Sequence, residues 1–126
     1  MFSGAHLLLY SRDAEADRAF LRDVLEFPTV DAGEGWLIFA LPPAEMGVHP
    51  GEKQIQHAGE GLAAGVLYLM CRDLRATMET LAGKGVACGP VQEAEWGVVT
   101  SIILPGGSRL GLYEPRHRLA IEAIRD

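Results

Sequence analysis

The sequence predicts an α+β fold built from two related modules, each with the order strand, helix and three strands. Short apolar runs that are typical of strands alternate with helix-period apolar stripes that follow Asp13 and Asp73. The two halves also match each other, because "LLLYSRD" and "LYLMCRD" end on these two aspartates, which are sixty residues apart. Trp36 and Trp96 show the same spacing. One such module leaves a sheet face and edge uncovered, so two are expected to pack together.

In the first module, residues 6–11 ("HLLLYS") are expected to form a buried strand that leads to a helix capped by Asp13. Pro28 helps to end that helix. Two strands around a glycine-rich turn are predicted within 29–41, and a further short strand within 44–50. The apolar stripe of the helix consists of Phe20, Leu21, Val24 and Leu25.

The second module repeats this order. Residues 65–71 ("GVLYLMC") are expected to form a strand, Asp73 to cap a helix, and Gly83 and Gly85 to end it. Three strands are expected to follow, within 86–91, 96–105 and 108–115. The basic cluster "PRHR" at 115–118 is expected to pack the tail or contact a partner, and "LAIEAIRD" to form a short helical turn.

Length and composition favour one cytoplasmic domain. The chain has 126 residues, divided into a first module of about 3–50, a linker of about 51–63, a second module of about 64–115 and a tail of 116–126. The net charge of −6 argues against nucleic-acid or anionic-membrane partners. Cys71 and Cys88 fit buried, reduced thiols. No apolar run is long enough for a signal peptide or a membrane span.

The repeat, together with "FLRDVLEFPTV", "LYLMCRDLRATMETLAGKGV" and "ILPGGSRLGLYEP", resembles the vicinal oxygen chelate superfamily. This superfamily includes glyoxalase I, extradiol dioxygenases, fosfomycin-resistance enzymes and bleomycin-resistance proteins. The resemblance extends from about residue 3 to residue 115. It implies that the modules curl into a cup-shaped, mostly antiparallel sheet with the helices outside. It is weak for activity, because one fold hosts many chemistries.

The resemblance also implies where metal ligands would lie. In metal-using relatives a histidine opens the first strand seven residues before the helix-starting acid, and His6 and Asp13 match that spacing. The equivalent position of the second module is Val66. The usual carboxylates of the last strands align with Gly47 and Gly111. Three of the four ligand positions therefore lack a ligand, and the sequence predicts a protein without a cofactor or the usual metal set.

One metal-binding alternative stays open. Glu45 and His49 flank Gly47 at two-residue spacing, so they share a sheet face, and a small change of register makes either a ligand. A His6–Glu45–His49 cluster would then hold a divalent metal. The protein would in that case be a lyase, isomerase or dioxygenase in which the metal polarises vicinal substrate oxygens and stabilises an enediolate.

Aromatic residues at matched positions suggest a ligand pocket. Trp36 and Trp96 either cap the sheet ends as core residues or line an aromatic pocket with Phe39, Tyr68 and Tyr113. His6 and His49 are candidates for polar contacts with the ligand.

These observations favour a homodimeric protein that binds a small organic molecule in the cup. Sequestration, unassigned chemistry and a ligand-responsive module without catalysis all fit the same residues.

Overall fold

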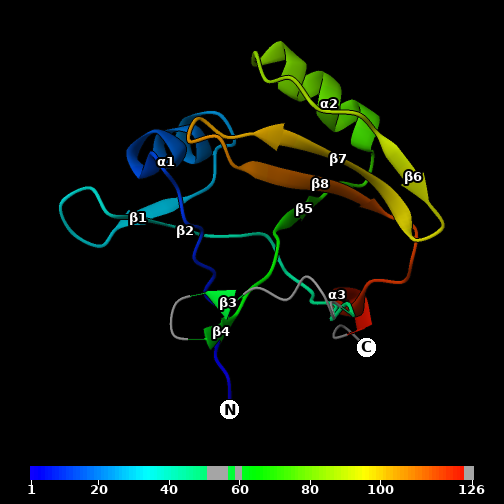
Figure 1. The fold of residues 1–126 in the computed structure, drawn as a ribbon, viewed down its shortest axis with the longest axis horizontal. Helices are drawn as coiled ribbons and strands as arrows, with labels where there is room; N and C mark the ends of the chain where they lie inside the picture. Colours follow the sequence, from blue (N-terminus) through cyan, green and yellow to red (C-terminus); the bar gives the residue numbers. More distant parts are fainter. Residues whose placement is uncertain (51–56, 59–60, 124–126) are drawn as a thin grey trace. The chain divides into compact units, whose positions relative to one another are not determined.

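A computed structural model describes residues 1–50, 57–58 and 61–123, and the chain divides into two compact units (Figure 1). The first unit contains Met1–Ala40 and Ile103–Arg109, and the second contains Leu41–Ile102 and Leu110–Asp126. Among the described helices, none combines the length and apolar character needed to cross a bilayer.

The first unit consists of a helix and a β-hairpin. Helix α1 (Ala14–Asp23) begins after Asp13, whose carboxylate accepts a hydrogen bond from the Ala16 N–H at 3.1 Å. Strands β1 (Thr29–Asp31) and β2 (Leu37–Phe39) pair antiparallel. The carboxylate of Asp31 accepts from the N–H groups of Gly33 and Gly35, two glycines with positive φ that let the chain reverse.

A buried carboxylate joins distant segments of this unit. Asp17 on α1 is 6% exposed and accepts hydrogen bonds from the Ser11 hydroxyl at 2.6 Å and the Gly106 N–H at 2.7 Å. A Cβ at Gly106 would collide with the Ser11 hydroxyl and with the Asp17 carboxylate. The turn at residues 104–107 is therefore held against α1 by a charge-assisted hydrogen bond.

The second unit contains a four-stranded sheet with the order β5-β8-β7-β6. Strands β5 and β8 run parallel, whereas β6 and β7 are antiparallel. A separate hairpin of β3 and β4 precedes the sheet. The elements are β3 (His57–Ala58), β4 (Leu62–Ala63), β5 (Tyr68–Met70), α2 (Leu74–Gly83), β6 (Gln92–Ala94), β7 (Gly97–Ile103), β8 (Arg109–Pro115) and α3 (Ala120–Ala123).

Helix α2 covers one face of this sheet (Figure 1). Asp73 caps the helix by accepting from the Ala76 N–H at 3.1 Å, and Glu114 of β8 accepts from the Leu74 N–H at 2.9 Å. Burial of the apolar faces of helix and strands supplies the main driving force for this packing. The buried apolar residues of the unit are Leu74, Leu81, Val98, Ile102, Leu110 and Leu112.

The α+β prediction is confirmed, with mixed parallel and antiparallel pairing in the sheet. Both predicted helix caps form, and the second half shows the complete order of strand, helix and three strands. The short helix near the C-terminus is also present, as α3.

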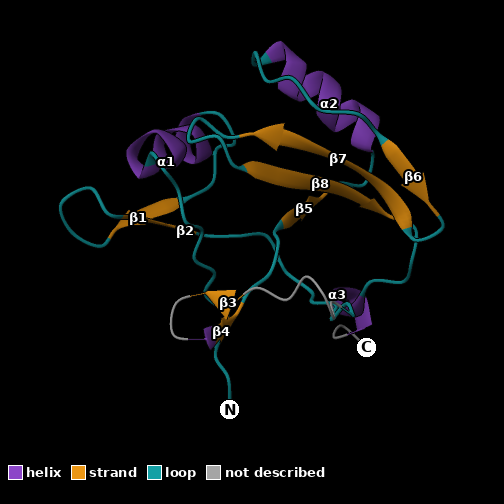
Figure 2. Ribbon diagram, viewed as in Figure 1, coloured by secondary structure: helices purple, strands orange, loops and turns teal. Residues whose placement is uncertain are grey.

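The first half lacks two expected strands. Residues 6–11 and 44–50 have no regular secondary structure and run as loops (Figure 2). A strand exists only where a second strand accepts and donates its main-chain hydrogen bonds, and no described segment of the chain does so for these residues. Local apolar patterning is therefore not sufficient to form them.

Two further boundaries differ from the prediction. The expected strand at 86–91 is reduced to one bridge between Cys88 and Ile102, and β6 begins only after Pro90. Proline has no N–H to donate to a sheet, which accounts for the later start. Residues 51–56 and 59–60 of the predicted linker lie outside the described residues.

Candidate functional site: an aromatic sheet face

The face of the sheet opposite α2 carries a cluster of aromatic rings. Because side chains alternate along a strand, Leu110 and Leu112 of β8 face α2, whereas Gly111 and Tyr113 face the other side. Register pairs Tyr68 of β5 with Gly111. The Tyr68 and Tyr113 rings meet edge to face, with centroids 6.1 Å apart and planes at 66°.

Two glycines make room for these rings. A Cβ at Gly111 would collide with the Tyr68 ring, and a Cβ at Gly97 of β7 would collide with the Tyr113 ring and with the Glu114 carbonyl. The tyrosines can therefore lie close to the sheet backbone. A larger side chain at Gly111 would therefore need the Tyr68 ring to move.

Trp96 and His117 extend the cluster, because each of their rings lies against Tyr113. The Trp96 ring centroid is 5.6 Å from that of Tyr113, and the His117 centroid is 5.8 Å away. The Tyr113 hydroxyl donates to the Trp96 carbonyl at 3.0 Å. Tyr68 is 47% exposed and Trp96 is 53% exposed, so both rings offer free surface. We call Tyr68, Trp96, Tyr113 and His117 the aromatic cluster.

A carboxylate lies beside the aromatic cluster. Glu45 Oε1 accepts from the Ala120 N–H at 2.8 Å, and Oε2 is 3.8 Å from His117 Nε2. Burial, with a smaller effect of the negative charge on Glu45, raises the pKa of Tyr113. The phenol is therefore neutral at physiological pH and can donate hydrogen bonds.

The described donors fit a metal poorly. His49 is exposed, and its Nδ1 lies 2.6 Å from the carbonyl oxygen of the next residue, Pro50. Glu45 already accepts a hydrogen bond from the Ala120 N–H. His6 is also exposed. Within the part of the chain that the structure describes, no group of three or more His, Cys, Asp or Glu residues is placed to hold an ion.

The remaining predicted aromatic residues lie in the first unit. Phe39 is half-buried in β2. Trp36 is 56% exposed, and the Arg18 guanidinium carbon lies 4.6 Å from its ring centroid. The structure thus brings three of the predicted ligand-binding residues into contact: Tyr68, Trp96 and Tyr113.

Sequence reasoning missed His117 as a site residue. The segment "PRHR" was interpreted only as a basic cluster, although His117 lies four residues after Tyr113 and two residues after the end of β8. The spacing alone does not show that the chain bends to bring the imidazole back over the tyrosine ring.

Solved structures of other proteins show which known fold this chain has. A scan of protein-family models found no match, and a search of curated proteins found no significant similarity. The structure is similar to a glyoxalase family protein from Enterococcus faecalis, with 16% identity, a TM-score of 0.57, and coverage of 90% of this chain and 98% of that one.

Two other solved structures agree. Lactoylglutathione lyase from Agrobacterium tumefaciens gives 19% identity and a TM-score of 0.54, with 89% and 93% of the two chains covered. TnmS3, an antibiotic binding protein from Streptomyces sp. CB03234, gives 20% identity and a TM-score of 0.50, with 91% and 99% covered. The chain therefore has the fold of the glyoxalase/bleomycin resistance protein/dioxygenase superfamily, as the sequence resemblance predicts.

Proposed function

We propose that the chain binds a small planar or amphipathic organic molecule on the aromatic cluster, without the usual divalent metal set. The observation that carries this proposal is the contact of Tyr68, Tyr113 and Trp96 on one sheet face, with two of the rings about half exposed. Half-exposed rings offer a stacking surface whose apolar area is removed from water when a flat ligand binds.

A cationic ring system suits this surface best. The chain has a net charge of −6, and the Glu45 carboxylate lies beside His117 of the aromatic cluster. Tyrosine and tryptophan faces attract cations through their ring quadrupoles. One solved structure of similar fold is an antibiotic binding protein, which supports the proposal that this chain binds a small organic molecule.

Tryptophan fluorescence tests the proposal, because the chain has only two tryptophans. Proflavine, a planar cation, should quench the emission, and Trp96→Leu should weaken its binding by about tenfold. Trp36→Leu is the matched control, since that indole lies in the first unit under Arg18. Quenching of equal strength and affinity in the Trp96→Leu protein would show that the planar ligand binds elsewhere.

Metal analysis separates the proposal from its enzymatic alternative. Protein purified without chelator or a metal-affinity tag should carry well under one equivalent of divalent metal, and chelator should leave its melting temperature unchanged. Stoichiometric zinc, nickel, manganese or iron that is lost in His6→Ala would instead favour a metal-dependent lyase, isomerase or dioxygenase that uses His6 with Glu45 or His49.

We further propose that the protein is a cytoplasmic homodimer. The two cysteines, Cys71 and Cys88, are free thiols, which suits a reducing compartment. Leu7, Leu8, Leu9 and Tyr10 are 46–73% exposed in the single chain, and a second copy would cover such an apolar segment.

A further inference from the structure

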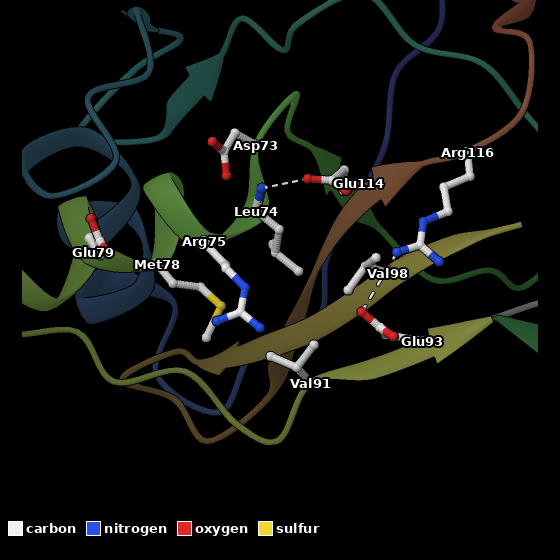
Figure 3. Close-up of a pocket in the computed structure, with 10 residues that line it drawn as sticks. All are labelled: Asp73, Leu74, Arg75, Met78, Glu79, Val91, Glu93, Val98, Glu114 and Arg116. Atoms are coloured by element: carbon white, nitrogen blue, oxygen red, sulfur yellow. Dashed lines mark hydrogen bonds and ion pairs between the residues drawn. The ribbon is translucent and has the colours of Figure 1, made fainter. Parts of the chain in front are cut away.

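We propose a second ligand site on the α2 side of the same sheet, a cavity that binds an amphipathic carboxylate. The cavity has a volume of about 400 Å³ and lies within the second unit, between α2 and strands β6 and β7 (Figure 3). This volume is in the range of sites that hold small organic molecules. The ligand class and the sheet face both differ from those of the function proposed above.

The base of the cavity is apolar. Leu74 and Met78 of α2 line it from the helix, and Val98 of β7 lines it from the sheet. Val91, just before β6, completes this surface and is 44% exposed. An aliphatic or aromatic group placed here would remove the exposed side of Val91 from water, which favours binding.

Three of the acids around the cavity are already engaged by the protein. Asp73 accepts from the Ala76 N–H, and Glu114 accepts from the Leu74 N–H at 2.9 Å. Glu93 lies 3.6 Å from a terminal nitrogen of Arg116. Glu93 is thereby paired with a positive charge, whereas Asp73 and Glu114 keep their negative charge beside neutral N–H donors. An anion in this cavity therefore depends on the remaining arginine of the lining, Arg75.

Arg75 differs from these groups, because its guanidinium has no carboxylate partner among the described residues. In Figure 3 its side chain extends from α2 toward Val91, whereas Glu79 points away from it. A guanidinium presents a planar fork of donors that matches a carboxylate with two parallel hydrogen bonds. The neighbouring apolar surface selects a carboxylate with an apolar body over a small inorganic anion.

The two sites lie on opposite faces of the same strands. Tyr113 and Glu114 are neighbours on β8, and Gly97 and Val98 are neighbours on β7. Successive side chains of a strand point to opposite faces, so the first of each pair belongs to the aromatic side and the second to the cavity. Loss of binding at one site therefore does not imply loss at the other.

Octanoate is the probe for the cavity, with isothermal titration calorimetry as the measurement. We expect saturable binding with a Kd of about 1 mM, and weakening by about tenfold in Arg75→Gln. Arg72→Gln is the matched control, because Arg72 is an exposed arginine near the start of the same helix that does not line the cavity. Val91→Asp should also weaken binding, since it places a negative charge on the apolar surface.

Two companion ligands separate the contributions of charge and apolar surface. Acetate and 1-octanol should each bind more weakly than octanoate by about tenfold or more, because each keeps only one of the two interactions. Octanoate affinity that is equal in wild type and in a folded Arg75→Gln protein would overturn the proposal. So would the absence of saturation, or binding that is lost in Tyr68→Leu and kept in Arg75→Gln.

Discussion

At the scale of single residues, two glycines leave space for the rings of the aromatic cluster. Gly111 and Gly97 are needed because tyrosine rings occupy the space that a side chain would fill at each position. The Tyr68 ring consequently lies close to the backbone at Gly111, and the Tyr113 ring lies close to the backbone at Gly97. The two glycines thus have a packing role that is separate from any conformational freedom.

Gly111→Ala should both lower the stability of the domain and shift the rings of the aromatic cluster. The added methyl would displace the Tyr68 ring, and we expect a loss of about 1–3 kcal/mol in the free energy of unfolding, with weaker proflavine binding. Urea denaturation followed by circular dichroism measures the first effect. Gly47→Ala is the control, because a Cβ there meets nothing within 4 Å. Equal stability of the two variants would contradict the packing role.

Tyr113 should make stability depend on alkaline pH. Its pKa is raised in the folded state, first by burial and then by the charge of Glu45. A group that binds its proton more tightly when folded contributes stability below its unfolded pKa of about 10, and that stability is lost as pH rises through the folded pKa. The unfolding free energy should therefore fall above about pH 10.

The Tyr113→Phe variant provides the comparison for this titration. Phenylalanine keeps the ring but has no ionisable hydroxyl, so the part of the alkaline decline that belongs to Tyr113 should disappear. Loss of the hydrogen bond to the Trp96 carbonyl should also lower stability by about 1 kcal/mol at neutral pH. An unchanged alkaline slope in this variant would show that other groups cause the decline.

Helices and strands differ in how far the local sequence determines them. The starts of α1 and α2 were predictable because Asp13 and Asp73 cap helices by accepting hydrogen bonds from N–H groups three residues further along the chain. The strand expected at 6–11 was not, because a strand takes its hydrogen bonds from a segment elsewhere in the chain or in another chain. The apolar pattern at 6–11 has no strand partner in the described part of the single chain.

Asp17→Ala should loosen the joint between α1 and the turn that follows β7. It would leave the Gly106 N–H and the Ser11 hydroxyl without their acceptor, and we expect a loss of about 1–3 kcal/mol in thermal or urea unfolding. Asp23→Ala is the matched control on the same helix, because that carboxylate is exposed and pairs with the neighbouring exposed Arg22. A comparable loss in both variants would argue against a special role for Asp17.

At the scale of the whole molecule, the exposed segment Leu7–Tyr10 and the sheet edges predict self-association. Sedimentation velocity at micromolar concentration should give a mass near twice the 13.6 kDa of one chain. Leu8→Asp should shift the distribution toward a single chain, because it places a charge on the segment to be covered. Leu41→Asp, at an exposed leucine outside this segment, is the control. A wild-type mass of one chain would contradict the dimer.

The sequence by itself determined the fold class, the starts and caps of α1 and α2, and the order of strand, helix and three strands in the second half. These features depend on local periodicity, capping chemistry and residue type, all of which are written in short stretches of the chain. Tyr68, Trp96 and Tyr113 were predictable as candidates for the same reason.

Only the tertiary structure decided which candidates meet. Strand register places Tyr68 over Gly111, and the bend after β8 returns His117 to Tyr113 and Glu45. The structure also shows that the Arg18 guanidinium lies over the Trp36 ring, and that Arg75 lines the cavity beside α2 without a carboxylate partner of its own among the described residues. Such contacts join residues that are distant in sequence, so they depend on packing that no local pattern encodes.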